Sequence, residues 1–388
     1  MKTQVRAPLP TTMTDLVNFD GLATSEVDSR VMAVMEPWLS LNSSPTSLHP
    51  LGQATANLHS KVRSQIAQRI GCNSEEVIFT GSCAQADNIA LKGFARSINK
   101  DDVDDRMAIM ASDSLSCLNS ARAIEKHGWD LDILQIDGEG VLDLTAAEQI
   151  LGPATKLVSC HLANEETGAI QPIEQLVKLV RNNSPQAIIH CNARAAFGRF
   201  EFNFADLGID SLSFEAKSIA GPMGCGVLIL KAGSRIAPSI LGGDGSAPLD
   251  TPNLANAQIA GLGATCELVT WKAGITTELI DAIAKSKLGK RCWTVSPEMC
   301  VEGIINLCMD GVSAEPLVVE CGINGLLISP SSGCTASAGK ASHVLSAMGI
   351  STENALSTIR ISINPATTVA DIHKGVTILE QSYSTLTK

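Results

Sequence analysis

A strand, a tight turn and a helix follow one another directly in Glu76-Val77-Ile78-Phe79-Thr80-Gly81-Ser82 and the segment 84–96 behind it. The β-favouring run before the glycine predicts the strand, and the glycine and serine break it. A further helix is expected in front, because apolar residues recur at helical spacing from Leu51 to Gly71, where a glycine ends the pattern. This order of elements is typical of an α/β protein.

The same alternation continues to about residue 230. Further strands are expected at 107–110, 131–136, 156–160, 187–191, 211–214 and 226–230, with helices at 116–127 and 173–180. Strands separated by helix-length segments form βαβ units, in which the strands lie parallel and helices cover both faces. We therefore predict a mostly parallel seven-stranded sheet between helices, with any ligand beyond the carboxyl ends of the strands.

The remainder of the chain has shorter and more mixed patterns. They predict helices at 255–273, 341–348 and 369–381, and strands at 318–321, 325–329 and 357–363. We interpret this part as a second, smaller α/β domain. The predicted organisation is an N-terminal segment 1–17, a large domain 18–265 and a small domain 266–388.

Charge and composition exclude several classes of function. The 388 residues include 40 acidic and 29 basic side chains, a formal charge of −11, which disfavours nucleic acid and anionic membranes as partners. With 8 Phe, 4 Trp and 1 Tyr, the core must be aliphatic, and stacking on nucleic-acid bases is not expected. No stretch approaches the roughly 18 consecutive apolar residues of a membrane-spanning helix.

Twelve cysteines are scattered along the chain, and no two are spaced as Cys-x-x-Cys. This spacing gives no support to a zinc or iron–sulfur site, so no metal is expected. No apolar leader follows Met1, and scattered thiols are typical of a reducing compartment. A cytoplasmic location is the expectation.

Six short motifs occur in an order that matches a known family. They are Phe19-Asp20-Gly21-Leu22-Ala23-Thr24, Leu48-His49-Pro50-Leu51-Gly52, the 76–82 turn with Ala86-Asp87-Asn88, Asn164-Glu165-Glu166-Thr167-Gly168, Ser331-Ser332-Gly333-Cys334-Thr335, and Ser357-Thr358-Ile359-Arg360-Ile361-Ser362. In this order the chain resembles the cysteine desulfurases, within the class V aminotransferase group of fold-type-I pyridoxal-phosphate (PLP) enzymes. The resemblance implies the fold-type-I PLP-transferase fold and a homodimer with its sites at the two-fold interface.

The lysine that would hold PLP as an imine is absent from its expected position. The family has Ser-Phe-Ser-Gly-His-Lys-x-x-Gly-Pro, and this chain has Ser213-Phe214-Glu215-Ala216-Lys217-Ser218-Ile219-Ala220-Gly221-Pro222. Ser218 stands at the lysine position, and a hydroxyl forms no imine. Lys217 is the neighbouring amine, but in an extended chain a shift of one residue points a side chain to the opposite face.

The groups that would face the cofactor ring are also changed. In place of the family's His-Val-Asp-Ala-x-Gln, the chain reads His190-Cys191-Asn192-Ala193-Arg194-Ala195. Asn192 is neutral and supplies no charge to hold a pyridinium proton. The family's ring-stacking histidine aligns with Ser114, which has no aromatic face.

The expected phosphate site departs from the family as well. The family's Gly-Ala-Thr step is Ser82-Cys83-Ala84 here, and a family serine that contacts phosphate is Glu215. A carboxylate about 4 Å from a phosphate costs about 4 kcal/mol at an effective dielectric constant of about 20. Lys217 could offset this by pairing with Glu215. Glu165 adds another acidic group, where the family has an asparagine.

Two functional positions of the family are retained. Cys334 aligns with the cysteine that carries the persulfide, and Arg360 aligns with the arginine that binds the substrate carboxylate. A structural role remains open for each of them. For Arg360 this role would be an ion pair with Glu165 or Glu215.

Three functions are therefore open. The leading expectation is a desulfurase-like protein that has lost PLP chemistry, needs no cofactor, and acts by binding a partner, for example in sulfur or iron–sulfur metabolism. The first alternative is a PLP-dependent cysteine desulfurase, or a related lyase or aminotransferase, that uses Lys217 and Cys334. The second alternative is a sensor that binds a carboxylated ligand at Arg360.

Overall fold

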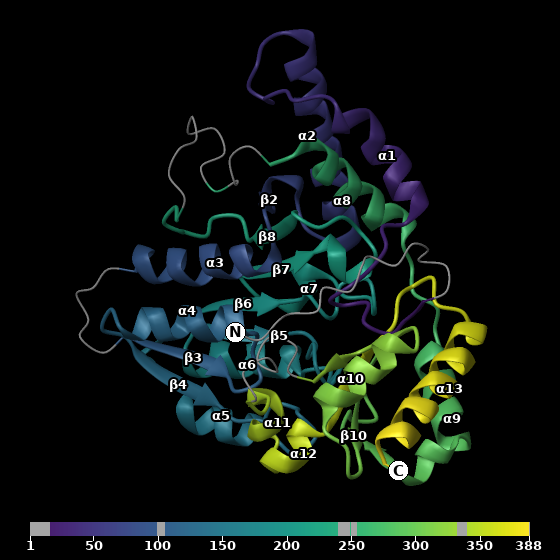
Figure 1. Cartoon of the computed structure of the whole chain (residues 1–388). Coiled ribbons are helices and arrows are strands. Elements are labelled where there is room, and N and C mark those ends of the chain that lie inside the picture. Colours follow the sequence, from purple (N-terminus) through teal and green to yellow (C-terminus); the bar gives the residue numbers. More distant parts are fainter. Residues whose placement is uncertain (1–15, 99–104, 240–248, 250–253, 332–339, 388) are drawn as a thin grey trace, which may run out of the picture.

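A seven-stranded sheet forms the centre of the larger part of the molecule (Figure 1). The computed structural model describes residues 16–98, 105–239, 249, 254–331 and 340–387. In spatial order the strands are β2 (Val77–Thr80), β8 (Gly226–Leu230), β7 (Ser211–Glu215), β6 (Ile188–Asn192), β5 (Thr155–His161), β3 (Arg106–Met110) and β4 (Asp130–Leu134). The pairs β2–β8 and β7–β8 are antiparallel and the other pairs are parallel. The predicted mostly parallel α/β sheet is confirmed.

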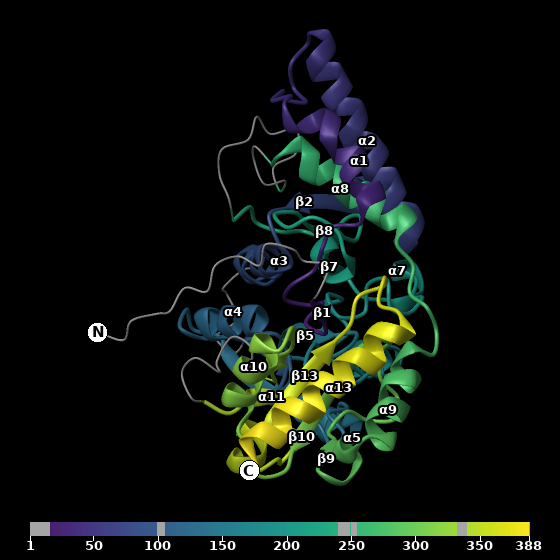
Figure 2. The ribbon, with the colours of Figure 1, turned by 45° about the vertical axis from the view of Figure 1, so that its right-hand side comes forward.

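Helices cover both faces of this sheet (Figure 2). On one face, α3 (Cys83–Ser97) and α4 (Leu115–Glu125) share a core with strand residues such as Ile78 and Leu157. On the other, α2 (Pro50–Ile70), α6 (Ile173–Asn183) and α8 (Asn256–Leu268) share a core with residues such as Phe79 and Val158. The faces alternate because successive side chains of a strand point in opposite directions.

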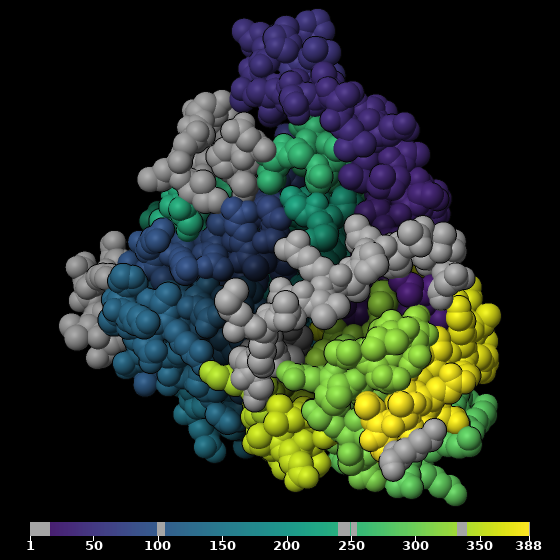
Figure 3. Space-filling model, viewed as in Figure 1, coloured from purple at the N-terminus to yellow at the C-terminus, as the bar shows by residue number. Residues whose placement is uncertain are grey.

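Helix α2 confirms the helix predicted to end at Gly71. This glycine has a left-handed φ of 77°, and its N–H donates to the Ala67 carbonyl at 2.9 Å, which caps an otherwise unpaired end. Helix α1 (Ser29–Leu39) precedes α2, and the connection between them protrudes from the body of the molecule (Figure 3). Both helices pack on α8.

A smaller antiparallel sheet carries the C-terminal part of the chain. Its strands in order are β12 (Ser329–Pro330), β13 (Thr358–Ser362), β10 (Ile304–Met309) and β9 (Cys292–Thr294), and its helices are α9 (Ile275–Lys285), α10 (Ala314–Ile323) and α13 (Val369–Leu386). These elements share a separate core that also takes in Phe19 from the N-terminal part. Strand β1 (Val17–Asn18) pairs with β11 (Leu326–Leu327). The domain boundaries at 17/18 and 265/266 stay a prediction.

The prediction of a strand at 318–321 is wrong, because this run lies inside helix α10. A short apolar run does not by itself distinguish a strand from a buried helical turn. Here Leu317 and Cys321, four residues apart, both face the core. The sequence patterns also left out α9 and β10.

The remaining elements are short. They are α5 (Leu144–Ile150), α7 (Phe204–Leu207), α11 (His343–Ala347), α12 (Thr352–Leu356) and the 3₁₀ turns η2 (Ser74–Glu76), η3 (Ala216–Ile219) and η4 (Lys287–Lys290). Of the helices that the structure describes, none combines the length and the hydropathy that crossing a bilayer requires.

Candidate functional site

Two rows of buried polar side chains cross the central strands on the face covered by α3. Each row takes one residue from β5, one from β6 and one from β7, placed side by side by the parallel register. The rows are Ser159, His190 and Ser211, and then His161, Asn192 and Ser213. The alternating residues on the opposite face are apolar, for example Cys191 and Leu212. A polar plate at the carboxyl ends of parallel strands is where an α/β protein is expected to bind a ligand.

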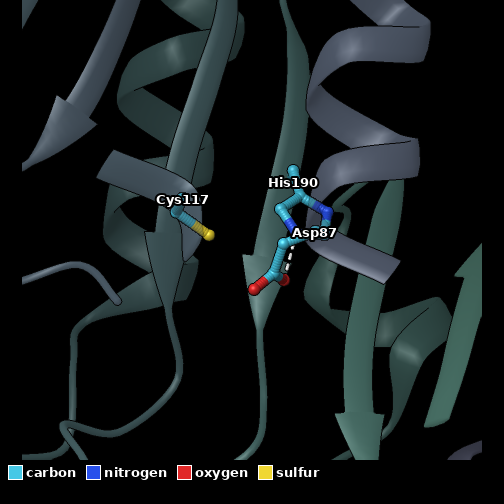
Figure 4. A group of neighbouring side chains, drawn as sticks. All are labelled: Asp87, Cys117 and His190. Atoms are coloured by element: carbon cyan, nitrogen blue, oxygen red, sulfur yellow. Dashed lines mark hydrogen bonds and ion pairs between the residues drawn. The ribbon is translucent and has the colours of Figure 1, made fainter. Parts of the chain in front are cut away.

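The carboxylate of Asp87, on α3, lies on this plate (Figure 4). It accepts hydrogen bonds from His190 Nε2 at 3.1 Å, from Asn192 Nδ2 at 3.0 and 3.2 Å, and from the Ser116 and Ser213 hydroxyls at 2.5 Å. Burial by itself would raise the pKa of Asp87, but His190 and the two hydroxyls outweigh it and lower the pKa. This residue was not singled out from the sequence, because its significance depends on which strands lie beneath α3.

Asp87, Cys117 and His190 together resemble a metal-ligand group (Figure 4). Burial, with the nearby Asp113 and Asp87 carboxylates, raises the pKa of the Cys117 thiol well above its usual value. The Asp87 oxygens are already engaged by the donors described above. Asp87 and His190 therefore belong to a hydrogen-bond network that already satisfies this carboxylate.

Ser218 lies in the 3₁₀ turn η3 at the end of β7 and is 2% exposed. Its hydroxyl donates to the Glu215 carbonyl at 2.9 Å, and its own carbonyl accepts from Arg199 Nη2 at 3.0 Å. The expectation of extended chain here was wrong. Because a 3₁₀ helix has about three residues per turn, Lys217 and Ser218 point about 120° apart instead of to opposite faces. Lys217 is half-buried.

The positions expected to bind a phosphate lie at the N-terminus of α3. The Ser82 hydroxyl caps this helix by accepting from the Gln85 N–H at 3.1 Å, and Ala84 is exposed in the first turn. The Cys83 N–H donates to Glu215 Oε2 at 3.1 Å. A side chain of the protein thus already occupies a donor that would contact an anion.

Arg194, in the turn after β6, joins Glu215 to Glu165. Its Nε lies 3.0 Å from Glu215 Oε1, and its Nη1 lies 2.6 Å from Glu165 Oε2. The charge of Arg194 lowers the pKa of Glu165. The cation that pairs with Glu215 is therefore Arg194, whereas the sequence had suggested Lys217. The position of Arg194, two residues beyond Asn192 at the carboxyl end of a strand, was the signal in the sequence that could have indicated it.

The described residues leave little space beside Asn192, where a cofactor ring would lie. The cavity there has a volume of about 10 Å³ and is lined by residues that include Ser114, His161, Asn192 and Arg194. Pockets for small molecules usually measure about 300–1,000 Å³, and about 10–15 Å³ holds one water. Ser114 instead caps α4 by accepting from the Cys117 N–H at 3.3 Å. The side chains present do not fit PLP.

Arg360, on β13, reaches the same site from the smaller sheet. Its Nη2 lies 3.3 Å from Asp20 Oδ1, and its Nη1 donates to the Glu165 carbonyl at 3.4 Å. The carboxylate partner is thus Asp20, and not Glu165 or Glu215 as suggested from the sequence. Nε of Arg360 is buried and has no hydrogen-bond partner within the described residues. Cys334 lies outside the described residues.

Three further titratable groups are buried around this site. Burial raises the pKa of Glu166 to about 7 and that of Asp113 to about 6, and it lowers the pKa of His161 to about 4. Glu166 Oε2 accepts from the hydroxyls of Ser342 at 2.5 Å and Ser331 at 3.1 Å. Burial thus shifts all three groups toward their uncharged forms.

The family model for aminotransferase class V matches residues 17–374, almost the whole chain. The chain belongs to the class V aminotransferase family. Among curated relatives, the chain is 30% identical to the cysteine desulfurase IscS of Dictyoglomus turgidum, with 94% of each chain covered. It is 28% identical to the cysteine desulfurase IscS 1 of Archaeoglobus fulgidus, with 93% of this chain and 95% of that one covered.

Solved structures agree with the fold. A NifS-like protein superposes with a TM-score of 0.86 at 24% identity, covering 95% of this chain and 100% of its own. The NifS-like protein of Rickettsia africae gives a TM-score of 0.81 at 26% identity, covering 95% and 99%. The family and the PLP-transferase fold expected from the sequence motifs are confirmed.

Proposed function

We propose that this class V family member has lost PLP Schiff-base chemistry and acts by binding a partner. The observation that carries the proposal is Ser218, which stands at the lysine position. Its hydroxyl is buried and donates a hydrogen bond to the Glu215 carbonyl. A hydroxyl provides no nitrogen for an imine. The filled space around Asn192 and Arg194 supports the same function.

The partner we propose is a protein of sulfur or iron–sulfur metabolism, bound by a homodimer of this chain in the cytoplasm. The relatives named cysteine desulfurase support the link to sulfur chemistry. The net charge of −11 supports a protein partner over nucleic acid.

The test is the colour of the purified protein with and without added PLP. A PLP imine absorbs at about 400–430 nm, and borohydride removes this band by reducing the C=N bond. We expect no such band and no rise in melting temperature with PLP, because a ligand that binds only the folded state would raise it. A borohydride-sensitive band in the wild-type protein would refute the proposal.

The second candidate is a PLP-dependent cysteine desulfurase that uses Lys217 as the imine-forming amine. The names of the relatives, at 28–30% identity over more than nine-tenths of this chain, favour this candidate over lost chemistry. It requires η3 to rearrange, since Lys217 and Ser218 point in different directions. Mass mapping of borohydride-treated protein would then find the pyridoxyl label on Lys217, and Lys217→Ala would abolish it.

The third candidate is a sensor that holds a ligand carboxylate at Arg360. The buried and unpaired Nε of this residue favours it. A free carboxylate would compete with Asp20 for the guanidinium. Thermal shifts with cysteine and other amino acids, lost in Arg360→Lys, would support this candidate, and their absence would contradict it.

A further inference from the structure

The carboxylate of Glu215 stands where an anionic ligand would meet helix α3. Its Oε2 accepts from the Cys83 N–H at 3.1 Å, and its side chain is 12% exposed. The N-terminus of a helix attracts anions, because its first N–H groups lack partners inside the helix and carry partial positive charge. In this chain the anion at the N-terminus of α3 is the side chain of Glu215, the last residue of β7.

Arg194 holds this carboxylate in place from the other side. Its guanidinium bridges Glu215, the last residue of β7, and Glu165, in the turn after β5, at 3.0 and 2.6 Å. The Arg194 backbone N–H also donates to Asn192 Oδ1 at 2.9 Å, which fixes the start of its side chain over the polar plate. The two carboxylates and the guanidinium thus form one connected unit.

This unit also takes up the space of the site. Glu165 and Arg194 both line the cavity of about 10 Å³ beside Asn192. A phosphorylated ring would have to displace the guanidinium and bring its phosphate against Glu215, which repels it. Restoring an amine at position 218 does not by itself relieve either obstacle.

We propose that Glu215, Arg194 and Glu165 are a built-in occupant of the cofactor cradle, which completes the fold without a cofactor and excludes PLP. The inference rests on the proposed function and adds a second barrier to it. Loss of the lysine removes the covalent attachment, and the three side chains close the volume in which the cofactor would lie. The unit is a structural substitute for a ligand and has no catalytic part.

The experiment compares PLP uptake by two engineered forms of the full chain. Ser218→Lys restores the amine alone, and Ser218→Lys/Glu215→Ser/Arg194→Ala also removes two parts of the occupant. When PLP binds, its aldehyde and the new amine lose water to form an imine, read at about 400–430 nm before and after borohydride. We expect roughly tenfold or more PLP per chain in the triple variant than in Ser218→Lys at the same free PLP concentration.

A matched control removes a surface ion pair instead. Arg69 and Glu201 lie 3.2 Å apart, with 27% and 80% of their side chains exposed. Ser218→Lys/Arg69→Ala/Glu201→Ser should take up no more PLP than Ser218→Lys, because an exposed pair stabilises little. Circular dichroism and melting temperature are recorded for every variant.

A gentler variant covers the case in which the triple variant does not fold. Ser218→Lys/Glu215→Gln keeps the size of residue 215 and removes its charge, so it should also bind more PLP than Ser218→Lys. Equal uptake by Ser218→Lys and either folded, opened variant would overturn the inference, as would no uptake by a folded, opened variant. A PLP imine in the wild-type protein would instead refute the proposed function, so the two failures are distinct.

Discussion

The buried negative charge of this site lies on Asp87 of α3, whereas the family motif implies a charge at position 192, at the end of β6. The family pattern expects a carboxylate at position 192, where this chain has an amide whose Nδ2 donates to Asp87. The charge therefore lies under α3, where His190 and two hydroxyls also bind it. A carboxylate surrounded by donors in this way stabilises the packing of α3 on the strands.

A chain of hydrogen bonds runs from Asp87 through His190 to Ser211, at 3.1 and 2.9 Å. The order of groups resembles the arrangement in serine hydrolases. All three side chains are fully buried, and Ser211 belongs to the strand row beneath α3. Since a nucleophile must reach its substrate, these residues serve structure.

Glu166 leads to a prediction about pH. Burial raises the pKa of Glu166 to about 7, from 4.5 in the unfolded chain. Between these two pH values the folded protein keeps the proton on Glu166, while the unfolded chain has lost it. Its contribution to stability is fully present below about pH 4.5 and is lost as the pH rises through about 7. Glu166→Gln does not ionise and should avoid that loss, on the order of 3 kcal/mol between about pH 5 and pH 8.

The measurement is the free energy of unfolding in urea at both pH values. The difference between Glu166→Gln and the wild type should move in favour of the variant as the pH rises. The exposed Glu125, changed to Gln, is the control and should show no such trend. Parallel pH profiles of Glu166→Gln and the wild type would contradict the prediction.

Among the helices, the glycines Gly375 in α13 and Gly322 in α10 should respond in opposite ways to alanine, because their surroundings differ. Replacing a helical glycine by alanine usually stabilises by up to about 1 kcal/mol. At Gly375, however, a Cβ would overlap the ring of Phe19 and lie 3.1 Å from Val17 Cγ1. Gly375→Ala should therefore destabilise the protein by about 1–3 kcal/mol, because the N-terminal part would have to move away from α13.

The matched control is Gly322, inside α10, where a Cβ would meet nothing within 4 Å. Gly322→Ala should leave the stability unchanged or raise it. Urea unfolding of the two variants beside the wild type measures both effects. If both substitutions stabilise, Phe19 does not hold α13 as described here.

For the whole molecule, the exposed apolar residues near the protruding α1–α2 connection lead to a prediction about assembly. Leu48 is 91% exposed, Leu39 59% and Leu51 52%, an unusual amount of apolar surface for one protruding segment. We expect a homodimer in solution that buries this surface, consistent with the dimer that the resemblance implies. Leu48→Asp/Leu51→Asp should shift the protein toward monomer by at least about tenfold in dissociation constant.

Sedimentation equilibrium of the full chain measures this shift. Ile323 is 74% exposed on α10, far along the chain from this segment, and Ile323→Asp serves as the control that should remain dimeric. A monomeric wild-type protein, or equal dissociation by the control, would show that the surface has another role.

The strands and most helices were predictable from the sequence because their signals are local. Periodicity located all seven strands of the large sheet, and the ordered motifs indicated the family. The absence of a lysine at position 218 was also predictable, because finding it requires only an alignment of the neighbouring residues with the family motif. The failures, such as the strand expected at 318–321, occurred where a short apolar run fits two structures equally well.

The sequence by itself thus determined the fold class and the absence of a lysine at position 218. Only the tertiary structure decided that Arg194 pairs with Glu215 at the N-terminus of α3, and that the buried carboxylate of the site is Asp87. The reason is that Glu215, Cys83 and Glu165 are more than 40 residues from one another along the chain. Their contacts exist because β7, α3 and the turn after β5 meet at one end of the sheet, an arrangement that no local pattern encodes.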